Sequence, residues 1–382
     1  MRIVVAAVVS RHPYVPGSVW NRFNYVSGLR SLGHEVYFVE EVGKGWRVDE
    51  WGYPCGFEAS VNRRHFARTV RHFGLDGRAC QLHEGDDRTE GLARTELAAV
   101  CRGADLLLNF SGHAKSELVV AGVRRRAYID QDPVYTQLWH AAYGSDLGFS
   151  RHDVFFTVGL NIGSERSAIP DCGVRWHPQL PPVDLQRWPM HPIAGRPVFT
   201  TVASLGGYRD LSYCGVTYGS KHAEFERLAT LPGVAGLPFE IALRADGFPR
   251  VLLDGMRRGG WRIADAARLS SLSAYRRFVA ASGAEICVAK GAYVRGRSGW
   301  LSDRSAQYLA SGKPVLAQST GFEAVLQTGE GLIGFDGLDD AARGARAIAS
   351  GYPRHCRAAR AFAERHLAAP RVMARLVETA CG

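Results

Sequence analysis

One stretch, residues 284–323, constrains the fold of this chain more than any other. It begins with a short apolar run, residues 285–289, whose β-branched side chains are typical of a buried strand. A loop of glycine, serine and cations follows. Next comes a helix, with Ser302 as its N-cap and Gly312 at its end, and residues 315–317 then form a second strand. The pattern predicts a strand–helix–strand unit with a glycine-rich loop before the helix.

The loop of this unit has the features of an anion-binding site. Backbone N–H groups and the helix dipole converge at the helix N-terminus, where they stabilise a negative charge. Cations surround the same point, so a diphosphate is the ligand that fits best. The alternative is an ordinary crossover with a solvated basic loop, because lone glycine motifs are weak signals. The candidate ligand-binding residues are Lys290, Arg295, Arg297, Ser298, Ser302, Asp303 and Arg304.

The next part of the stretch resembles a known family. Residues 308–316 read YLASGKPVL, similar to the EAxAxGxPV element of GT-B glycosyltransferases, and the longer string SGWLSDRSAQYLASGKPVLAQSTGF resembles a bacterial branch of that superfamily. The resemblance implies an α/β fold of GT-B type, in which two Rossmann-like domains face one another across a cleft. It departs at Gln307, where many relatives have a glutamate that holds the donor ribose. A neutral amide still bonds a hydroxyl, so Gln307 is expected to contact the ribose.

Length and charge limit the classes of function. The chain has 382 residues, which fits two domains of ordinary size. Its net charge of +10 is compatible with nucleic acid, an anionic membrane or a phosphate-bearing substrate, and a genome rich in arginine codons is the plain alternative. Because no nucleic-acid-binding motif and no long basic run is present, we expect no nucleic-acid partner.

The N-terminal segment predicts a Rossmann-type β-α-β unit. Residues 3–9 form a continuous apolar strand, residues 20–32 show helical spacing and residues 36–39 form the next strand. The GxGxxG fingerprint is missing, so a dinucleotide site is not indicated. The unit resembles the opening of GT-B enzymes, whose first loop lies against the donor phosphates. That resemblance implies that Gly17 and Ser18 contact the donor.

Two histidines lie in loops at the carboxyl ends of predicted strands, where open α/β sheets bind ligands. His12 follows the first strand, and His113 follows the buried strand of residues 104–110. An inverting glycosyltransferase needs a base for the acceptor hydroxyl, and both side chains are candidates. For a lone histidine such as His113, a structural role is the alternative.

Two carboxylates, Asp130 and Asp132, end a short predicted strand of residues 126–129. Carboxylates in this position serve as a general base or bind hydroxyl groups. The alternative is that Asp132 caps the helix that begins after Pro133, since proline fits the first turn of a helix.

A cluster of prolines in residues 169–197 predicts an interdomain linker. We expect an N-terminal acceptor domain over residues 1–185 and a C-terminal donor domain over residues 193–355. In GT-B enzymes the terminal helix crosses back, so residues 356–382 are expected to pack on the first domain. In the second domain, the polar loop of residues 206–219 precedes a helix.

A lysine at the start of that helix marks a second possible phosphate seat. The resemblance places Lys221 near the donor diphosphate. The alternative is an exposed lysine at the opening of the second domain. Residues 41–53 form a loop rich in glycine and tryptophan that is a candidate for acceptor contact. The interpretation that we favour there is that Trp46 and Trp51 cover nearby core.

The remaining signals are largely exclusions. The eight cysteines form no CxxC pair, so neither a zinc site nor another resident metal is expected. No apolar run reaches the roughly 20 residues of a membrane helix. We therefore expect a cytoplasmic chain without integral membrane association.

The sequence predicts a metal-independent glycosyltransferase. Its partners are a nucleotide-diphosphate sugar donor and a small-molecule or natural-product acceptor, with no further cofactor. The alternatives are an epimerase or hydrolase of a nucleotide sugar with the same fold, or a catalytically silent nucleotide-sugar-binding protein.

Overall fold

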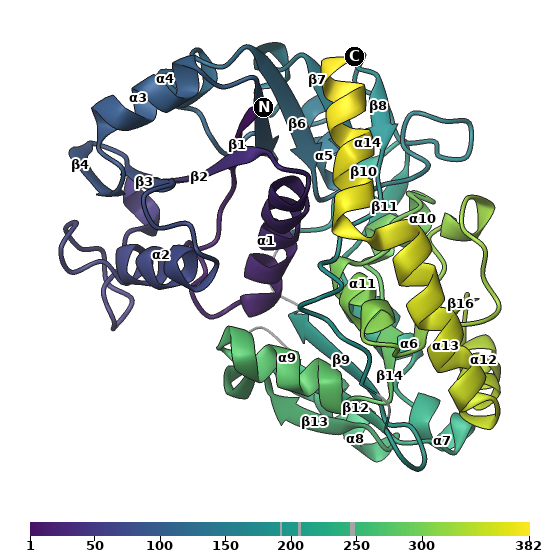
Figure 1. Cartoon of the computed structure of the whole chain (residues 1–382). Coiled ribbons are helices and arrows are strands. Elements are labelled where there is room, and N and C mark those ends of the chain that lie inside the picture. The colour runs from purple at the N-terminus through teal and green to yellow at the C-terminus, as the bar shows by residue number, and fades with distance from the viewer. Residues whose placement is uncertain (192, 205–207, 245–248) are drawn as a thin grey trace.

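The computed structural model describes residues 1–191, 193–204, 208–244 and 249–382. Part of the predicted loop of residues 206–219 therefore lies outside the described residues. The described chain builds two α/β domains, each around its own largely parallel sheet (Figure 1). Within the described residues, no helix combines the length and the apolar character that spanning a membrane requires.

The N-terminal sheet has the strand order β4-β3-β2-β1-β5-β6-β7-β8 and is parallel except for the β3–β4 pair. Its strands are β1 (Arg2–Ala6), β2 (Glu35–Val42), β3 (Ala79–His83), β4 (Asp86–Gly91), β5 (Leu106–Phe110), β6 (Arg125–Asp130), β7 (Val154–Thr157) and β8 (Trp176–Pro178). Its helices are α1 (Pro16–Ser31), α2 (Val61–His72), α3 (Arg94–Arg102), α4 (Glu117–Val120) and α5 (Tyr135–Ala141).

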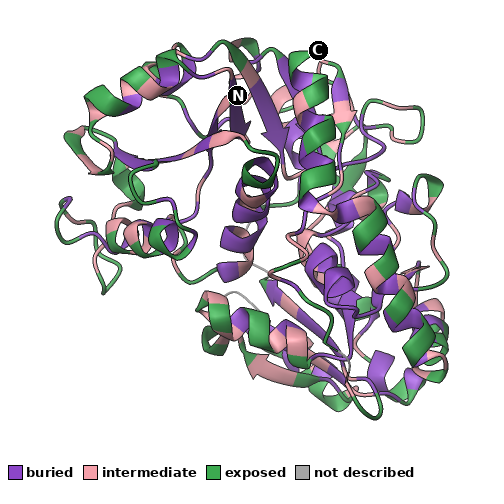
Figure 2. Ribbon diagram, in the orientation of Figure 1, coloured by how far each residue is buried: buried purple, intermediate pink, exposed green. Residues whose placement is uncertain are grey.

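Strand β1 shows why this sheet is buried on both faces. Ile3 and Val5 pack into the core beneath α1, whereas Val4 and Ala6 pack into a second core beneath α3 and α4. Successive side chains of a strand point to opposite faces, so a strand covered on both sides must be apolar throughout. Figure 2 shows the same pattern, with buried strands and helices whose outer faces are exposed.

The C-terminal sheet is parallel, with the strand order β13-β12-β9-β14-β15-β16. Its strands are β9 (Phe199–Ser204), β12 (Phe239–Arg244), β13 (Arg262–Asp265), β14 (Ala284–Cys287), β15 (Val315–Gln318) and β16 (Leu332–Phe335), and a separate antiparallel pair joins β10 (Leu211–Tyr213) to β11 (Val216–Tyr218). The helices are α6 (His222–Arg227), α7 (Leu231–Ala235), α8 (Arg250–Arg258), α9 (Leu272–Ala281), α10 (Gly291–Arg295), α11 (Asp303–Ala310), α12 (Leu338–Ser350) and α13 (Tyr352–Phe362).

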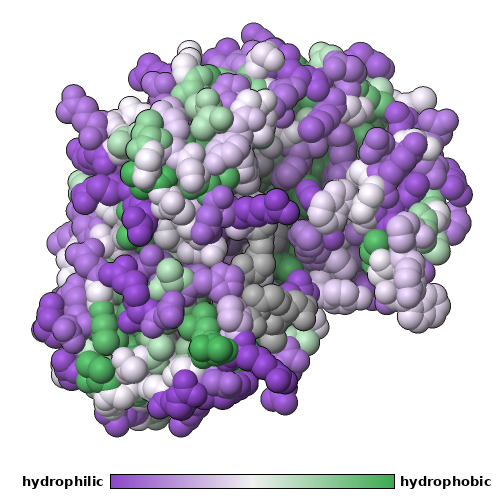
Figure 3. All heavy atoms as spheres, turned by 180° about the vertical axis from the view of Figure 1, so that it is seen from behind, coloured by the Kyte–Doolittle hydropathy of each residue, from purple (hydrophilic) through white to green (hydrophobic). Residues whose placement is uncertain are grey.

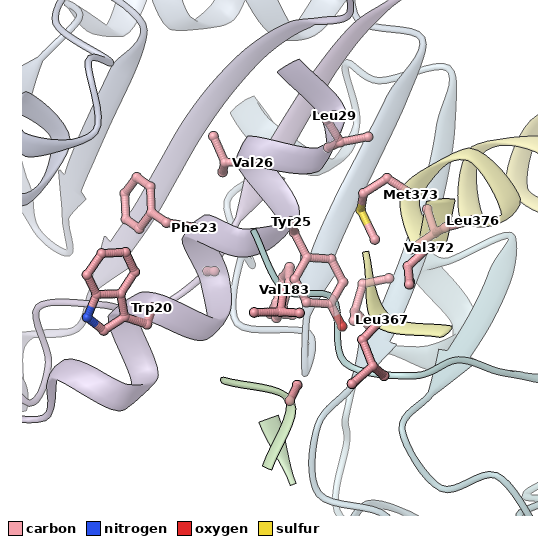
Figure 4. Close-up of a cluster of buried hydrophobic side chains, with 14 of the residues drawn as sticks. Trp20, Phe23, Tyr25, Val26, Leu29, Val183, Leu367, Val372, Met373 and Leu376 are labelled. Atoms are coloured by element: carbon pink, nitrogen blue, oxygen red, sulfur yellow. The ribbon is translucent and has the colours of Figure 1, made fainter. Parts of the chain in front are cut away.

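The last helix, α14 (Ala369–Cys381), leaves the second domain and packs along α1 of the first. Met373 and Leu376 point toward α1 from α14 (Figure 4). Gly28 allows the two helices to approach closely, because a Cβ at this position would lie 2.6 Å from the carbonyl oxygen of Ala369. The chain ends on the N-terminal sheet, where Arg125 donates to the carbonyl oxygen of Ala380 at 2.9 Å.

Candidate active site in the interdomain cleft

Both sheets turn the carboxyl ends of their strands toward one another. The strand order reverses between β1 and β5, whose following loops carry Arg11, His12 and His113. In the second domain it reverses between β9 and β14, and Lys290 follows β14. Loops diverge at such switch points and leave a crevice for ligands. Figure 3, a view from behind, shows a notch between the two domains with many hydrophilic side chains along its rim.

Asp132 and Lys290 meet across this cleft. Lys290 Nζ donates to Asp132 Oδ1 at 2.8 Å, and the Tyr293 hydroxyl donates to the same oxygen at 2.8 Å. The Tyr208 hydroxyl donates to Asp132 Oδ2 at 2.9 Å. Burial raises the pKa of Asp132, but the Lys290 charge and these hydrogen bonds outweigh it and hold that pKa below its ordinary value. The capping interpretation is wrong, because this carboxylate bonds side chains of the cleft rather than the N-terminus of α5.

Asp130 is the internal support of the Asp132 turn. It is fully buried, and its two oxygens accept from four donors at 2.6–3.1 Å: the Asp132 backbone N–H, the Thr136 and Thr157 hydroxyls, and the Gln137 amide. A carboxylate without accessible surface does not reach an acceptor hydroxyl. The structure therefore gives Asp130 a positioning role and removes it from the candidate bases.

His113 lies at the cleft surface with an exposed side chain. Desolvation by the surrounding protein lowers its pKa to about 4, the charges of Arg22 and Arg11 lower it further, and Asp132 opposes them. The ring is therefore neutral at pH 7, which is the form that accepts a proton. Arg22 also acts on Asp303 of the second domain, so these residues face a common space.

His12 lies on the same side of the cleft. Its ring contacts the indole of Trp46 edge-on, with 5.6 Å between ring centroids. Partial burial lowers the pKa of His12, and the charges of Arg11 and Arg244 lower it further. Because Arg244 ends β12, the charge of the second domain reaches His12 across the cleft.

Lys221 is a cation without a local partner. It precedes α6, and its side-chain amine makes no hydrogen bond or ion pair with any residue that the structure describes. Burial lowers its pKa to about 8, and the charges of Arg304 and Lys290 contribute in the same direction. An anion that reaches the amine would therefore be stabilised without displacing an internal carboxylate.

Arg304 and Ser298 each bond to groups within the fold, and their ligand contacts stay predictions. Arg304 Nε donates to the fully buried Glu285 Oε1 at 2.5 Å, and Arg304 also donates to the Val202 carbonyl oxygen at 2.9 Å. Ser298 is buried, and its hydroxyl donates to the Tyr293 carbonyl oxygen at 3.3 Å. Arg304 thus joins strands β9 and β14, whereas Ser298 bonds the backbone of α10.

The N-terminus of α11 is built as the sequence predicts. Ser302 accepts from the Arg304 backbone N–H at 3.2 Å, which confirms it as the N-cap. Asp303 is half-buried in the first turn; burial raises its pKa, and Arg22 and Arg304 oppose that shift. Gly312 ends the helix with φ = 68°.

Two further predicted residues lie apart from the pair of Asp132 and Lys290. Arg295 is exposed at the end of α10. Arg297 has φ = 44° and lines a depression of about 440 Å³ together with Glu323 and Asp336. Neither Lys290 nor Lys221 lines that depression.

Gln307 lies beneath Tyr275. Its side chain is fully buried and accepts from the Tyr275 hydroxyl at 2.8 Å, while its Nε2 has no partner. Gly17 and Ser18 belong to the first turn of α1, and a Cβ on Gly17 would lie 3.5 Å from the same hydroxyl. The ribose contact of Gln307 and the donor contacts of Gly17 and Ser18 stay predictions.

The structure adds residues that the sequence patterns did not single out. Arg11 and Arg22 join the histidines of the cleft. A signal for Arg22 existed, because it lies four positions after Ser18 and so shares its helix face. The prediction that Trp46 and Trp51 cover core is wrong, since these side chains are 41% and 76% exposed. Hydrogen bonds from the Trp51 and Tyr53 backbones to Asp49 hold that loop away from the core.

Among the residues that the structure describes, no group of three or more His, Cys, Asp or Glu side chains is arranged to hold a metal ion. The eight cysteines are free thiols.

No family model matches this chain, and no curated protein matches it in sequence. Among solved structures, HepE from Anabaena in complex with UDP and glucose matches 99% of each chain, with a TM-score of 0.58 and 11% identity. An alpha-glucosyltransferase in complex with UDP and a 13-mer DNA containing an A:G mismatch matches 100% of this chain and 99% of its own, with a TM-score of 0.58 and 14% identity. The fold is GT-B. Sucrose-phosphate synthase from Thermosynechococcus elongatus shares it over 99% of this chain and 98% of its own, with a TM-score of 0.51 and 12% identity. The predicted GT-B fold is thus confirmed.

Proposed function

We propose that this protein transfers a sugar from a nucleotide-diphosphate sugar to a small-molecule or natural-product acceptor. The observation that carries the proposal is Lys221, a half-buried cation without an internal partner on the donor side of a GT-B cleft. The GT-B neighbours named above support it, because HepE and the alpha-glucosyltransferase were each solved in complex with UDP.

In this proposal, the second domain stabilises the leaving diphosphate. Lys221 supplies a full positive charge, and the N-terminus of α11, capped by Ser302, supplies oriented backbone N–H groups. Charge that is fixed before the reaction stabilises the leaving group without reorganisation at the moment of transfer. These groups supply the positive charge that a divalent metal provides in other transferases, so the proposed reaction is independent of metal.

The first domain supplies the acceptor side. For an inverting transfer, we assign the base to His113, which is exposed to the cleft and neutral at pH 7. Asp132 is ionised, but Lys290, Tyr293 and Tyr208 bond its oxygens and reduce their basicity. Its proposed role is to hold Lys290 and to orient hydroxyl groups of the bound sugar.

A thermal-shift panel of nucleoside diphosphates and nucleotide sugars tests the donor site. A ligand that binds only the folded state, at about a thousand times its dissociation constant, adds about 4 kcal/mol to the free energy of unfolding. We expect one nucleoside diphosphate and its sugars to raise the midpoint, and we expect Lys221→Met to reduce that rise. The matched control is Arg68→Met, which changes an exposed cation of the other domain. No rise with any nucleotide at millimolar concentration would refute the donor site.

Turnover is then measured as release of the nucleoside diphosphate with a panel of small acceptors. A duplex DNA belongs in the panel, because one structural neighbour was solved with DNA. Release that depends on a small acceptor supports the transferase. Release without any acceptor indicates a hydrolase, and binding without release indicates a silent nucleotide-sugar-binding protein.

A further inference from the structure

Two arginines of the N-terminal domain, Arg11 and Arg22, carry charge that no carboxylate balances. Among the described residues, neither guanidinium makes an ion pair or a hydrogen bond, and the Nε atom of each is buried without a partner. Other arginines of the same domain form ion pairs, Arg47 with Asp86 and Arg63 with Glu90, although the Nε atom of each is also buried without a partner. A partly buried cation without a counter-ion is costly, so its presence in a cleft indicates an anionic ligand.

Both arginines lie near the carboxyl ends of the neighbouring strands β1 and β5, since Arg11 follows β1 and the Arg22 guanidinium lies over Phe110 at the end of β5. Arg11 comes from the loop after β1 and Arg22 from the second turn of α1, and the charges of both act on His113. Neither Asp132 nor Asp303 forms an ion pair with these two arginines. Asp132 is bonded to Lys290, and Asp303 feels the charge of Arg22 without forming an ion pair with it. The acceptor side of the cleft therefore keeps two uncompensated positive charges.

Aromatic rings hold both guanidinium groups. The Arg11 guanidinium lies 3.1 Å from the ring centroid of Trp46, and that of Arg22 lies 5.6 Å from the ring centroid of Phe110. Stacking on a ring leaves the N–H donors of arginine free at the edge of the group while it restricts their direction. Groups fixed in this way lose less entropy when a ligand binds.

The loop of Arg11 is itself anchored from below. The buried Glu40 accepts from the Val9 and Ser10 backbone N–H groups at 2.9 and 2.8 Å. The Asn62 amide donates to the Ser10 carbonyl oxygen at 2.8 Å. The backbone that carries Arg11 is thus held by the interior of the domain, so the position of this cation is built into the fold.

We propose that Arg11 and Arg22 form an anion-binding site for the acceptor, which carries a carboxylate or phosphate group close to the hydroxyl that receives the sugar. This inference rests on the proposed transferase function and specifies its acceptor class. Lys221 belongs to the opposite domain and serves the donor diphosphate, so the two anions of the reaction occupy separate positive sites. His113 lies beside the acceptor site, where it reaches a hydroxyl of a molecule that is held by its anionic group.

Inorganic phosphate and acetate are the probes of the site. Thermal midpoints are measured with each anion in wild type saturated with UDP, with the ionic strength held constant because salt screens such contacts. We expect phosphate, acetate or both to raise the midpoint further. The Arg11→Met/Arg22→Met double variant is expected to lose that rise and to keep the rise that UDP causes. Arg68→Met is the matched control and is expected to retain both rises.

Three outcomes would overturn the inference. The first is that neither anion raises the midpoint of wild type, and the second is that the rise disappears once UDP saturates the donor site. The third is a double variant that keeps the full rise. If UDP itself has no effect on any variant, the proposed function fails, and the anion titration of wild type without nucleotide still decides whether Arg11 and Arg22 form a site. If the Met double variant does not fold, the Arg11→Lys/Arg22→Lys double variant replaces it. This variant keeps both positive charges, so it must retain an effect of phosphate on the midpoint.

Acceptor kinetics give a second readout. The preference for an anionic acceptor is measured as the ratio of kcat/KM values for two matched acceptors, one with and one without the anionic group. Arg22→Met is expected to lower this ratio by about 30-fold, which is the order expected for a lost hydrogen bond to a charged group. The loss should fall on KM for the acceptor, with KM for the donor unchanged. An unchanged preference would contradict the assignment.

Discussion

Asp132 and Lys290 lie on opposite sides of the cleft and are joined by a hydrogen bond of 2.8 Å between Asp132 Oδ1 and Lys290 Nζ. The ammonium group also lies 4.2–5.0 Å from the ring centroids of Tyr135, Tyr208 and Tyr293. Residues of both domains therefore enclose a single charge pair. This arrangement links the relative position of the domains to the charges that line the cleft.

Replacement of Asp132 by Asn tests this link. We expect the free energy of unfolding to fall by about 1–3 kcal/mol, because the substitution leaves the half-buried Lys290 without its counter-charge. UDP is expected to bind more tightly, since Lys290 becomes available to a phosphate. Urea denaturation and titration calorimetry measure the two effects. The control is Asp153→Asn, which removes the partner of Arg126 at the start of β6, and equal effects of both substitutions would contradict a special role for Asp132.

Lys221 predicts a pH dependence of donor binding. Because its pKa is lowered to about 8, the amine is charged below this pH and loses its charge above it. The affinity for UDP should therefore fall as the pH rises through 8, by up to about tenfold per unit. In Lys221→Arg the cation persists, so the decrease should vanish. Calorimetry at pH 7, 8 and 9 measures it, and a wild-type affinity that stays constant would exclude Lys221 from the donor site.

Because Arg304 pairs with Glu285, we expect replacement of Arg304 to lower the stability of the fold rather than the affinity for UDP. Arg304→Met leaves the fully buried Glu285 without a counter-charge, which should lower the free energy of unfolding by about 3–5 kcal/mol. Combining it with Glu285→Leu should restore much of that loss. Urea denaturation measures both, and the exposed neighbour Arg295→Met serves as a control. Loss of UDP binding at unchanged stability would show instead that Arg304 contacts the donor.

His83 predicts acid sensitivity. Its buried ring hydrogen-bonds Gln81 at 2.9 Å, and burial lowers its pKa to about 4, with Arg47 contributing. The unfolded chain titrates near 6.5, so between pH 6.5 and 4 unfolding takes up a proton and stability falls with falling pH. His83→Gln should remove up to about 1.4 kcal/mol of that dependence per pH unit. Denaturation midpoints at several pH values are measured for His83→Gln and for a control, His191→Gln, which changes an exposed histidine. Identical slopes of stability against pH in the two variants would contradict the role of His83.

The order of the elements was largely readable from local patterns. The apolar run of residues 3–9 overlaps β1, and that of residues 104–110 contains β5, because strands buried on both faces must be apolar throughout. Ser302 and Gly312 marked the ends of α11 for the same kind of local reason, since a cap needs a side-chain acceptor and a helix end favours positive φ. These features depend on residues within a few positions of one another.

The partners of the charged side chains could not be predicted from local sequence patterns. Arg295, Arg297, Arg304 and Lys290 belong to one basic segment, yet Arg304 pairs with Glu285, Arg297 lines a separate depression and Lys290 bonds Asp132. One signal was present in the sequence. A glutamate within an apolar strand requires a buried partner, which pointed to a structural cation near Glu285 without naming it.

By itself, the sequence determined the two α/β halves and the helix that opens at Ser302. Only the tertiary structure decided which cations face the cleft. Asp132 and Lys290 are 158 residues apart, and Arg22 reaches Phe110 because β1 and β5 are neighbours in the sheet. Local patterning fixes backbone conformation through neighbouring residues, whereas the partner of a long, flexible charged side chain is fixed by whichever distant segments the sheet order brings beside it.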